Sequence, residues 1–165
     1  MKDLLNNLVD SLREELKEYG EMLALLDQQQ EMVMRRETQD LLQCVQTINA
    51  QVETISVARL EREQRQRNLA WMFGLAEDAP FASLVPHLPD EYKPLVQALF
   101  QENNELLKRI QRRARQNHLL LSRIVELMQR LFDQFFPGTR TTTYDVTGVL
   151  SGTGLPQHSL YEAVG

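Results

Sequence analysis

Cysteine is almost absent from this sequence. Cys44 is the only one in 165 residues, so no disulfide bond can form within the chain. It lies among Leu41, Leu42, Val45 and Ile48, an apolar setting without the activating base that a cysteine nucleophile needs. We therefore expect Cys44 to pack in a core. Proteins without disulfides are typical of a reducing compartment, and we predict a cytoplasmic protein.

Long apolar runs are also missing. A membrane-spanning helix needs about 18 consecutive apolar residues, and no stretch of this chain provides them. The first ten residues mix acids and amides into their apolar positions, whereas a signal peptide has an unbroken apolar segment. We predict no direct membrane insertion.

Excess positive charge is the third feature that the chain lacks. The net charge of −5 and the pI near 5.3 disfavour a protein that mainly neutralises phosphates, so we predict no nucleic-acid partner. The arginines do cluster, however, and on antiparallel neighbouring helices they could form one basic band that meets an acidic partner. A solvated helix face is the simpler interpretation. The clusters are Arg59, Arg62, Arg65 and Arg67, and Lys108, Arg109, Arg112, Arg113 and Arg115.

Candidate chemistry is sparse. His87, His118 and His158 fall in separate segments without ligand spacing, and no glycine-rich phosphate loop follows a strand. The carboxylates, as in Arg13-Glu14-Glu15 and Lys17-Glu18, alternate with basic residues and are interpreted as solvated surface charges. We expect no catalytic residue, no metal and no cofactor.

Heptad spacing of apolar residues is what the chain has in abundance. A first helix of about 3–36 carries Leu5, Leu12, Tyr19, Leu26 and Val33 at intervals of seven. A second helix, 39–73, continues with Leu41, Ile48 and Ile55 and ends before Gly74, a predicted C-cap. Residues 61–68 contain no apolar side chain, so we expect that stretch to be solvated.

The second half of the chain holds a connector and a longer helix. Pro80, Pro86 and Pro89 limit residues 75–90 to one short helix at 80–85. A third long helix, 91–136, follows, with a seam at alternating steps of three and four that includes two asparagines, which fix register when buried. Its members are Val96, Phe100, Asn103, Leu107, Ile110, Ala114, Asn117, Leu121, Ile124, Met128, Leu131 and Phe135.

Together these patterns predict an all-α fold. Residues 1–137 form an antiparallel bundle of three long amphipathic helices with a short helical connector, and residues 138–165 form a Gly/Thr-rich C-terminal tail. The third helix would be about 70 Å long against about 50 Å for the others. Either it bends near an asparagine to give a four-helix bundle, or one end lacks partners. In the second case its apolar C-terminal residues form a binding surface.

With the helices and tail assigned, the sequence resembles the FlgN family of flagellar export chaperones. The resemblance covers most of the chain as a pattern of helices. Its most specific pieces are Asn117-His118-Leu119-Leu120 in the third helix and Thr143-Tyr144-Asp145-Val146-Thr147-Gly148 in the tail. It implies an all-helical cytoplasmic chaperone that binds hook-associated subunits, keeps them from associating early and delivers them to the type III export gate.

The resemblance and the apolar pattern place partner binding in the C-terminal part. The resemblance also implies that the tail tyrosine, Tyr144, helps to dock on the export gate. The alternative is a homo-oligomeric coiled-coil structural or adaptor protein, and a homodimer is left open. The predicted partner-binding residues are Asn117, Leu120, Leu121, Ile124, Leu127, Met128, Leu131, Phe132, Phe135, Tyr144, Asp145 and Gly148.

Overall fold

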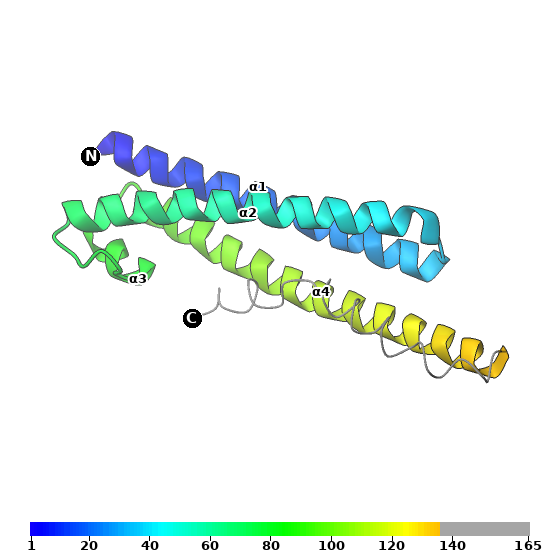
Figure 1. Ribbon diagram of the computed structural model, residues 1–165. Helices are drawn as coiled ribbons and strands as arrows, with labels where there is room; N and C mark the ends of the chain where they lie inside the picture. Colours follow the sequence, from blue (N-terminus) through cyan, green and yellow to red (C-terminus); the bar gives the residue numbers. More distant parts are fainter. Residues whose placement is uncertain (136–165) are drawn as a thin grey trace. The chain divides into compact units, whose positions relative to one another are not determined.

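The structure, a computed structural model, describes residues 1–135 and consists there of helices and their connections (Figure 1). Three helices are long: α1 (Lys2–Arg35), α2 (Thr38–Met72) and α4 (Lys93–Phe135). Between α2 and α4 lie the single turn α3 (Phe81–Leu84) and a short 3-10 helix, Val85–His87. The prediction of an all-α bundle of three long helices with a short helical connector is confirmed. The predicted tail, 138–165, lies outside the described residues.

A residue with positive φ follows each of α1 and α2 and ends the helix. Arg36 takes a left-handed conformation, φ 60°, and the following amide of Glu37 donates to the carbonyl of Met32 at 3.0 Å. After α2, Gly74 takes φ 69°, which confirms its predicted capping role, because glycine adopts this conformation without a Cβ penalty. The turn after α1 brings α1 and α2 side by side and antiparallel (Figure 1).

Apolar side chains of the three long helices form two separate core clusters. The first cluster joins Leu5, Leu8 and Leu12 of α1 to Leu69 of α2. It also includes Phe81 of α3, which stacks on Phe100 of α4 with 4.0 Å between the ring centroids. The second is built around Tyr19, Met22, Leu26, Cys44, Ile48 and Ile110. The prediction that Cys44 packs in a core is confirmed: it is 6% exposed, and burial raises the pKa of its thiol.

A polar layer separates these two clusters. Glu15 follows Leu12 by one turn of α1 and is 3% exposed. The Tyr19 hydroxyl donates to its Oε1 at 2.9 Å, and Arg62 Nε donates to its Oε2 at 3.1 Å. Burial, followed by the charge of Glu15, raises the pKa of Tyr19 far above its ordinary value. Both carboxylate oxygens are therefore occupied, which offsets the loss of hydration.

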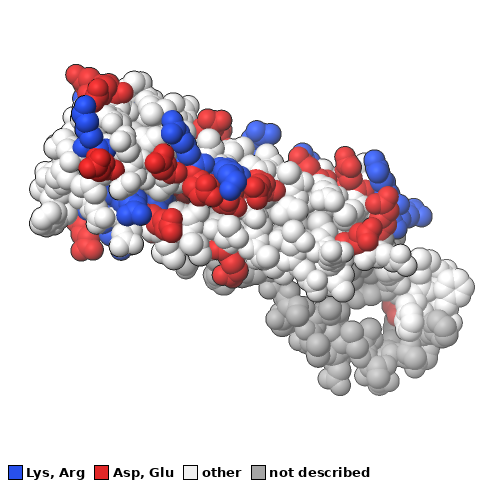
Figure 2. Space-filling model, turned by 90° about the horizontal axis from the view of Figure 1, so that it is seen from above, with Lys and Arg blue, Asp and Glu red and all other residues white. Residues whose placement is uncertain are grey.

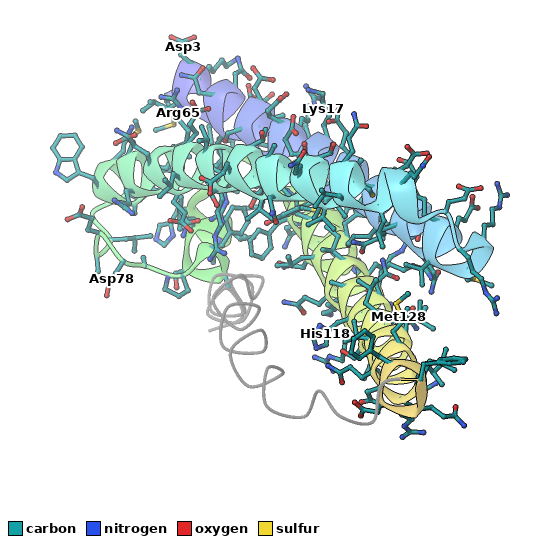
Figure 3. The ribbon with its side chains drawn as sticks, turned by 45° about the vertical axis from the view of Figure 1, so that its right-hand side comes forward. Asp3, Lys17, Arg65, Asp78, His118 and Met128 are labelled. Atoms are coloured by element: carbon teal, nitrogen blue, oxygen red, sulfur yellow. The ribbon has the colours of Figure 1, made fainter. Side chains whose placement is uncertain are left out.

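A second buried carboxylate lies one turn farther along α1. Glu18 is 5% exposed, and Gln51 of α2 donates from Nε2 to its Oε2 at 2.6 Å and to its backbone carbonyl at 3.0 Å. Lys17 projects from α1 in Figure 3, and its Nζ lies 3.2 Å from Oε1 of Glu18. The expectation that these carboxylates are solvated is wrong for Glu15 and Glu18. The expectation of a solvated 61–68 stretch is wrong at Arg62, whose side chain is 13% exposed.

Two asparagines attach α4 to α1. Asn103 Nδ2 donates to the carbonyl of Leu12 at 3.1 Å, and Asn117 Nδ2 donates to the carbonyl of Leu26 at 2.7 Å. Asn117 also reaches Gln29 Oε1 at 3.0 Å. The donors are two heptads apart on α4 and the acceptors two heptads apart on α1, so the two helices run parallel here in one register. α4 continues as one α-helix through both asparagines, and neither interrupts it.

We predict that Arg62→Ala lowers the free energy of unfolding by about 3 kcal/mol, because it leaves Glu15 as a buried carboxylate without its charged partner. Urea denaturation followed by circular dichroism measures the change. Arg67→Ala is the matched control on the same helix: its side chain is 51% exposed and 3.9 Å from Glu63. That control should lose less than about 1 kcal/mol. Equal losses in both variants would contradict the structural role of the Arg62–Glu15 pair.

We predict that Glu18 makes stability depend on acidity. The hydrogen bond from Gln51, ahead of the contact with Lys17, holds the pKa of Glu18 below its ordinary value of 4.5. A carboxyl whose pKa is lowered by folding stabilises the fold above its unfolded pKa, and this contribution is lost as the pH falls through the folded pKa. Unfolding free energies measured from about pH 7 down to about pH 3 should fall less steeply in Gln51→Leu than in the wild type. Glu21→Gln, at an exposed carboxylate of the same helix, should keep the wild-type slope.

Candidate functional site

The seam of α4 changes character at Asn117. Val96, Asn103, Ile110 and Asn117 are buried, and Asn117 is the last buried residue of the helix. Beyond it, the predicted seam positions from Ile124 onward are all exposed. The first part of the predicted seam is therefore packed in the bundle, and the side chains of the second part are exposed from Ile124 onward.

The C-terminal face of α4 is the set of apolar side chains that this second part presents. They recur at steps of one, three and four, so they share one side of the helix. The exposed fraction ranges from 37% at Ile124 to 75% at Phe135, while Leu120 and Leu121 are half-buried. Met128 projects from α4 in Figure 3 and is 63% exposed. The face comprises Leu120, Leu121, Ile124, Leu127, Met128, Leu131, Phe132 and Phe135.

Charged residues of the same segment occupy the other side of the helix. At 100° per residue, Glu126 and Asp133 fall opposite the centre of the apolar face, and Arg123 and Arg130 lie on its flank. Val125, which the sequence prediction missed, is 50% exposed and borders that face. Its position one residue after Ile124 was the signal that could have found it. An amphipathic helix with its apolar side exposed can bind an apolar helix or groove of a partner.

Asn117 stands apart from the other predicted partner-binding residues. It is 1% exposed and its amide hydrogens are donated to α1. The structure thus places Asn117 in the core, at the point where the packed part of α4 ends. The predicted tail residues Tyr144, Asp145 and Gly148 lie outside the described residues.

The predicted basic band is divided between two environments. On α2, the half-buried Arg62 pairs with Glu15, and Arg59 pairs with Glu63 at 3.0 Å. Arg65, labelled in Figure 3, projects from α2. On α4, by contrast, several basic side chains are exposed, and Arg113 pairs with Asp27 of α1 at 2.6 Å. Acidic and basic groups are interspersed on the face of the molecule seen in Figure 2.

Within residues 1–135 no group of three or more potential metal ligands comes together. In the same part of the chain, none of the helices has the length and apolarity required to cross a bilayer. The thiol of Cys44 faces the backbone carbonyl of Leu25 at 4.0 Å, in the second core cluster.

The described residues form a bundle of long helices in which the apolar side chains at the end of α4 are exposed. A family model described as FlgN protein matches residues 1–152. The chain belongs to the FlgN family, the flagellar export chaperones, and the resemblance noted from its motifs is confirmed. Comparison with curated proteins and with solved structures finds no match.

Proposed function

We propose that this protein is a cytoplasmic chaperone that binds hook-associated subunits and presents them to the flagellar export gate. Membership of the FlgN family supports the general role in flagellar export. The observation that carries the specific proposal is the C-terminal face of α4, with Leu127, Met128 and Phe135 at 58%, 63% and 75% exposure. Exposed apolar patches on globular proteins mark interaction sites.

The proposed role of this face is to prevent aggregation of its client. A subunit that polymerises through apolar helices exposes those helices before assembly, and they aggregate in water. A chaperone helix with an apolar face of its own can cover them. The face is confined to one side of α4, so a client helix can lie along it while Glu126 and Asp133 remain in solvent on the other side. Binding of this kind needs no nucleotide, metal or catalytic group.

The tail is proposed to act in the second step. Tyr144, Asp145 and Gly148 belong to the tail sequence that resembles the family pattern, and the family resemblance assigns the tyrosine to docking on the export gate. In this proposal, α4 binds the client and the tail binds the export gate. Client binding and gate binding are then separable by mutation.

We predict that Leu127→Glu combined with Leu131→Glu weakens binding of hook-associated proteins by at least about tenfold, because charges would enter an apolar interface. Isothermal titration calorimetry with purified hook-associated proteins of the same organism measures the affinity. The matched control, Leu42→Glu with Leu60→Glu on α2, makes the same chemical change at side chains 69% and 62% exposed. It should bind as the wild type does. Loss in both pairs, or in neither, would contradict the proposed surface.

Two further measurements separate the remaining alternatives. Tyr144→Ala should bind the client normally but reduce its secretion, and a loss of client affinity would assign the tyrosine to client binding instead. Light scattering distinguishes the coiled-coil adaptor. If the C-terminal face pairs copies of this chain, the wild type is a stable dimer, the leucine double variant is a monomer, and added client changes neither.

A further inference from the structure

A basic surface on α4, separate from the C-terminal face, carries a second inference. Residues 108–115 contain five basic side chains and no acidic one, in a chain whose net charge is −5. This segment lies between Asn103 and Asn117, the two residues that attach α4 to α1. Ile110 is 2% exposed and points into the second core cluster. The basic side chains are therefore held on a fixed part of the bundle with a defined outward direction.

Not all of these charges are neutralised by their neighbours. Lys108 pairs with Glu105 at 3.0 Å, and Arg113 pairs with Asp27 at 2.6 Å. Arg109 and Arg112 are both exposed, and within residues 1–135 no acidic side chain lies at ion-pair distance from either. They are three residues apart on the helix, so their guanidinium groups are neighbours on one side of it. We call them the arginine pair.

The arginine pair borders two hollows in the surface. One, of about 190 Å³, lies between α1 and α4 and is lined by both arginines, by Leu23 and by Asp27. The other, of about 420 Å³, is lined by Arg112 together with Lys108 and Glu105. Asp27 already accepts a hydrogen bond from Arg113 and forms no ion pair with Arg109 or Arg112. A carboxylate entering the first hollow would meet two guanidinium forks, which bind carboxylates through two parallel hydrogen bonds.

We infer that the arginine pair is a docking site for an acidic protein segment whose carboxylates are one helical turn apart. The spacing of Arg109 and Arg112 matches that of two acidic residues on one face of a helix. This site goes beyond the proposed apolar client surface and uses different residues and a different kind of attraction.

A protein segment fits this surface better than a nucleic acid does. Nucleic-acid binding by a helical surface relies on many phosphate contacts and on aromatic side chains that stack on bases. From residue 101 to residue 131, α4 has no Phe, Tyr or Trp, and the chain as a whole is acidic. Two guanidinium groups with no acidic side chain of residues 1–135 at ion-pair distance are enough for a pair of carboxylates but supply few of the contacts that a phosphate backbone requires.

The test is a titration of the full-length protein with a fluorescently labelled helical peptide, read by fluorescence anisotropy. The probe is an alanine-rich peptide of about four turns with glutamates one turn apart. Its control has glutamine at the same positions. We expect the glutamate peptide to bind at least about tenfold more tightly than the glutamine peptide, and the preference to weaken as salt is added.

Variants assign the binding to the arginine pair. Arg109→Glu with Arg112→Glu should abolish the preference for the glutamate peptide. The matched control is Arg13→Glu with Arg35→Glu, which makes the same change in net charge at side chains 58% and 67% exposed. It should change the affinity less than about twofold. Arg109→Lys with Arg112→Lys should give an intermediate affinity, because lysine keeps the charge and loses the fork.

Several results would overturn the inference. Equal effects of the two glutamate double variants would show general electrostatic attraction and no site. Tighter arginine-dependent binding of a single-stranded oligonucleotide would assign the surface to nucleic acid. Competition by inorganic phosphate at the peptide's own concentration would reduce it to a simple anion site.

Thermal unfolding checks that each variant folds, and nuclear magnetic resonance of the wild-type arginine Nε–H signals provides a readout without mutation. Unperturbed signals at Arg109 and Arg112 on addition of the glutamate peptide would also contradict it.

Discussion

The hydrogen bonds from Asn103 and Asn117 to the backbone of α1 are the constraint on which the arrangement of α4 depends. Each buried amide donates to a carbonyl that also serves the helix ladder, which is possible because a carbonyl oxygen has two lone pairs. Their matching two-heptad spacings allow both bonds in only one register. Sliding α4 along α1 would leave at least one amide buried and unpaired, at a cost of about 1–3 kcal/mol. The asparagines therefore select a register that apolar packing alone would define less sharply.

The same principle operates between α1 and α2. Glu15 and Arg62 form a polar layer between two apolar clusters, and Glu18 and Gln51 form another contact beside it. Such groups contribute less to stability than apolar residues of equal size, but they penalise every misaligned packing. The bundle up to Asn117 thus combines apolar clusters with polar contacts that fix its alignment. Because these contacts lie in the bundle, they do not involve the exposed side chains of the C-terminal face of α4.

Much of the fold was predictable, because apolar heptads report which side of a helix is buried. Leu5, Leu12 and Tyr19 marked the buried side of α1, and the seam of α4 included both asparagines. Glu15 and Arg62 were assigned wrongly because their charge was given more weight than their position. Arg62 continues the seven-residue row of Ile48 and Ile55, and Leu69 follows it. What no single-helix pattern could give is the pairing of Glu15 with Arg62, since that depends on how two helices meet.

The candidate site was predictable in a different way. The apolar face from Leu120 to Phe135 follows from periodicity, but periodicity describes a buried face and an exposed face equally well. Only the structure shows that burial ends at Asn117. The unequal helix lengths left two possibilities open, a bend in the third helix near an asparagine or one helix end without partners. The sequence could not distinguish the arginine pair from the neighbouring arginines. Arg113 forms an ion pair with Asp27 and Arg109 does not, and only the structure shows this difference.

The central claim is that α4 is packed up to Asn117 and offers its C-terminal face to a client beyond it. Hydrogen exchange along α4, measured by mass spectrometry with and without a hook-associated protein, tests this most directly. Without client, amides of residues 93–117 should exchange much more slowly than those of residues 118–135, because exchange follows local burial and packing. Added client should slow residues 118–135 by at least about tenfold and leave residues 93–117 unchanged. Equal protection along the whole helix without client, or protection by the client only in α1 and α2, would contradict the account.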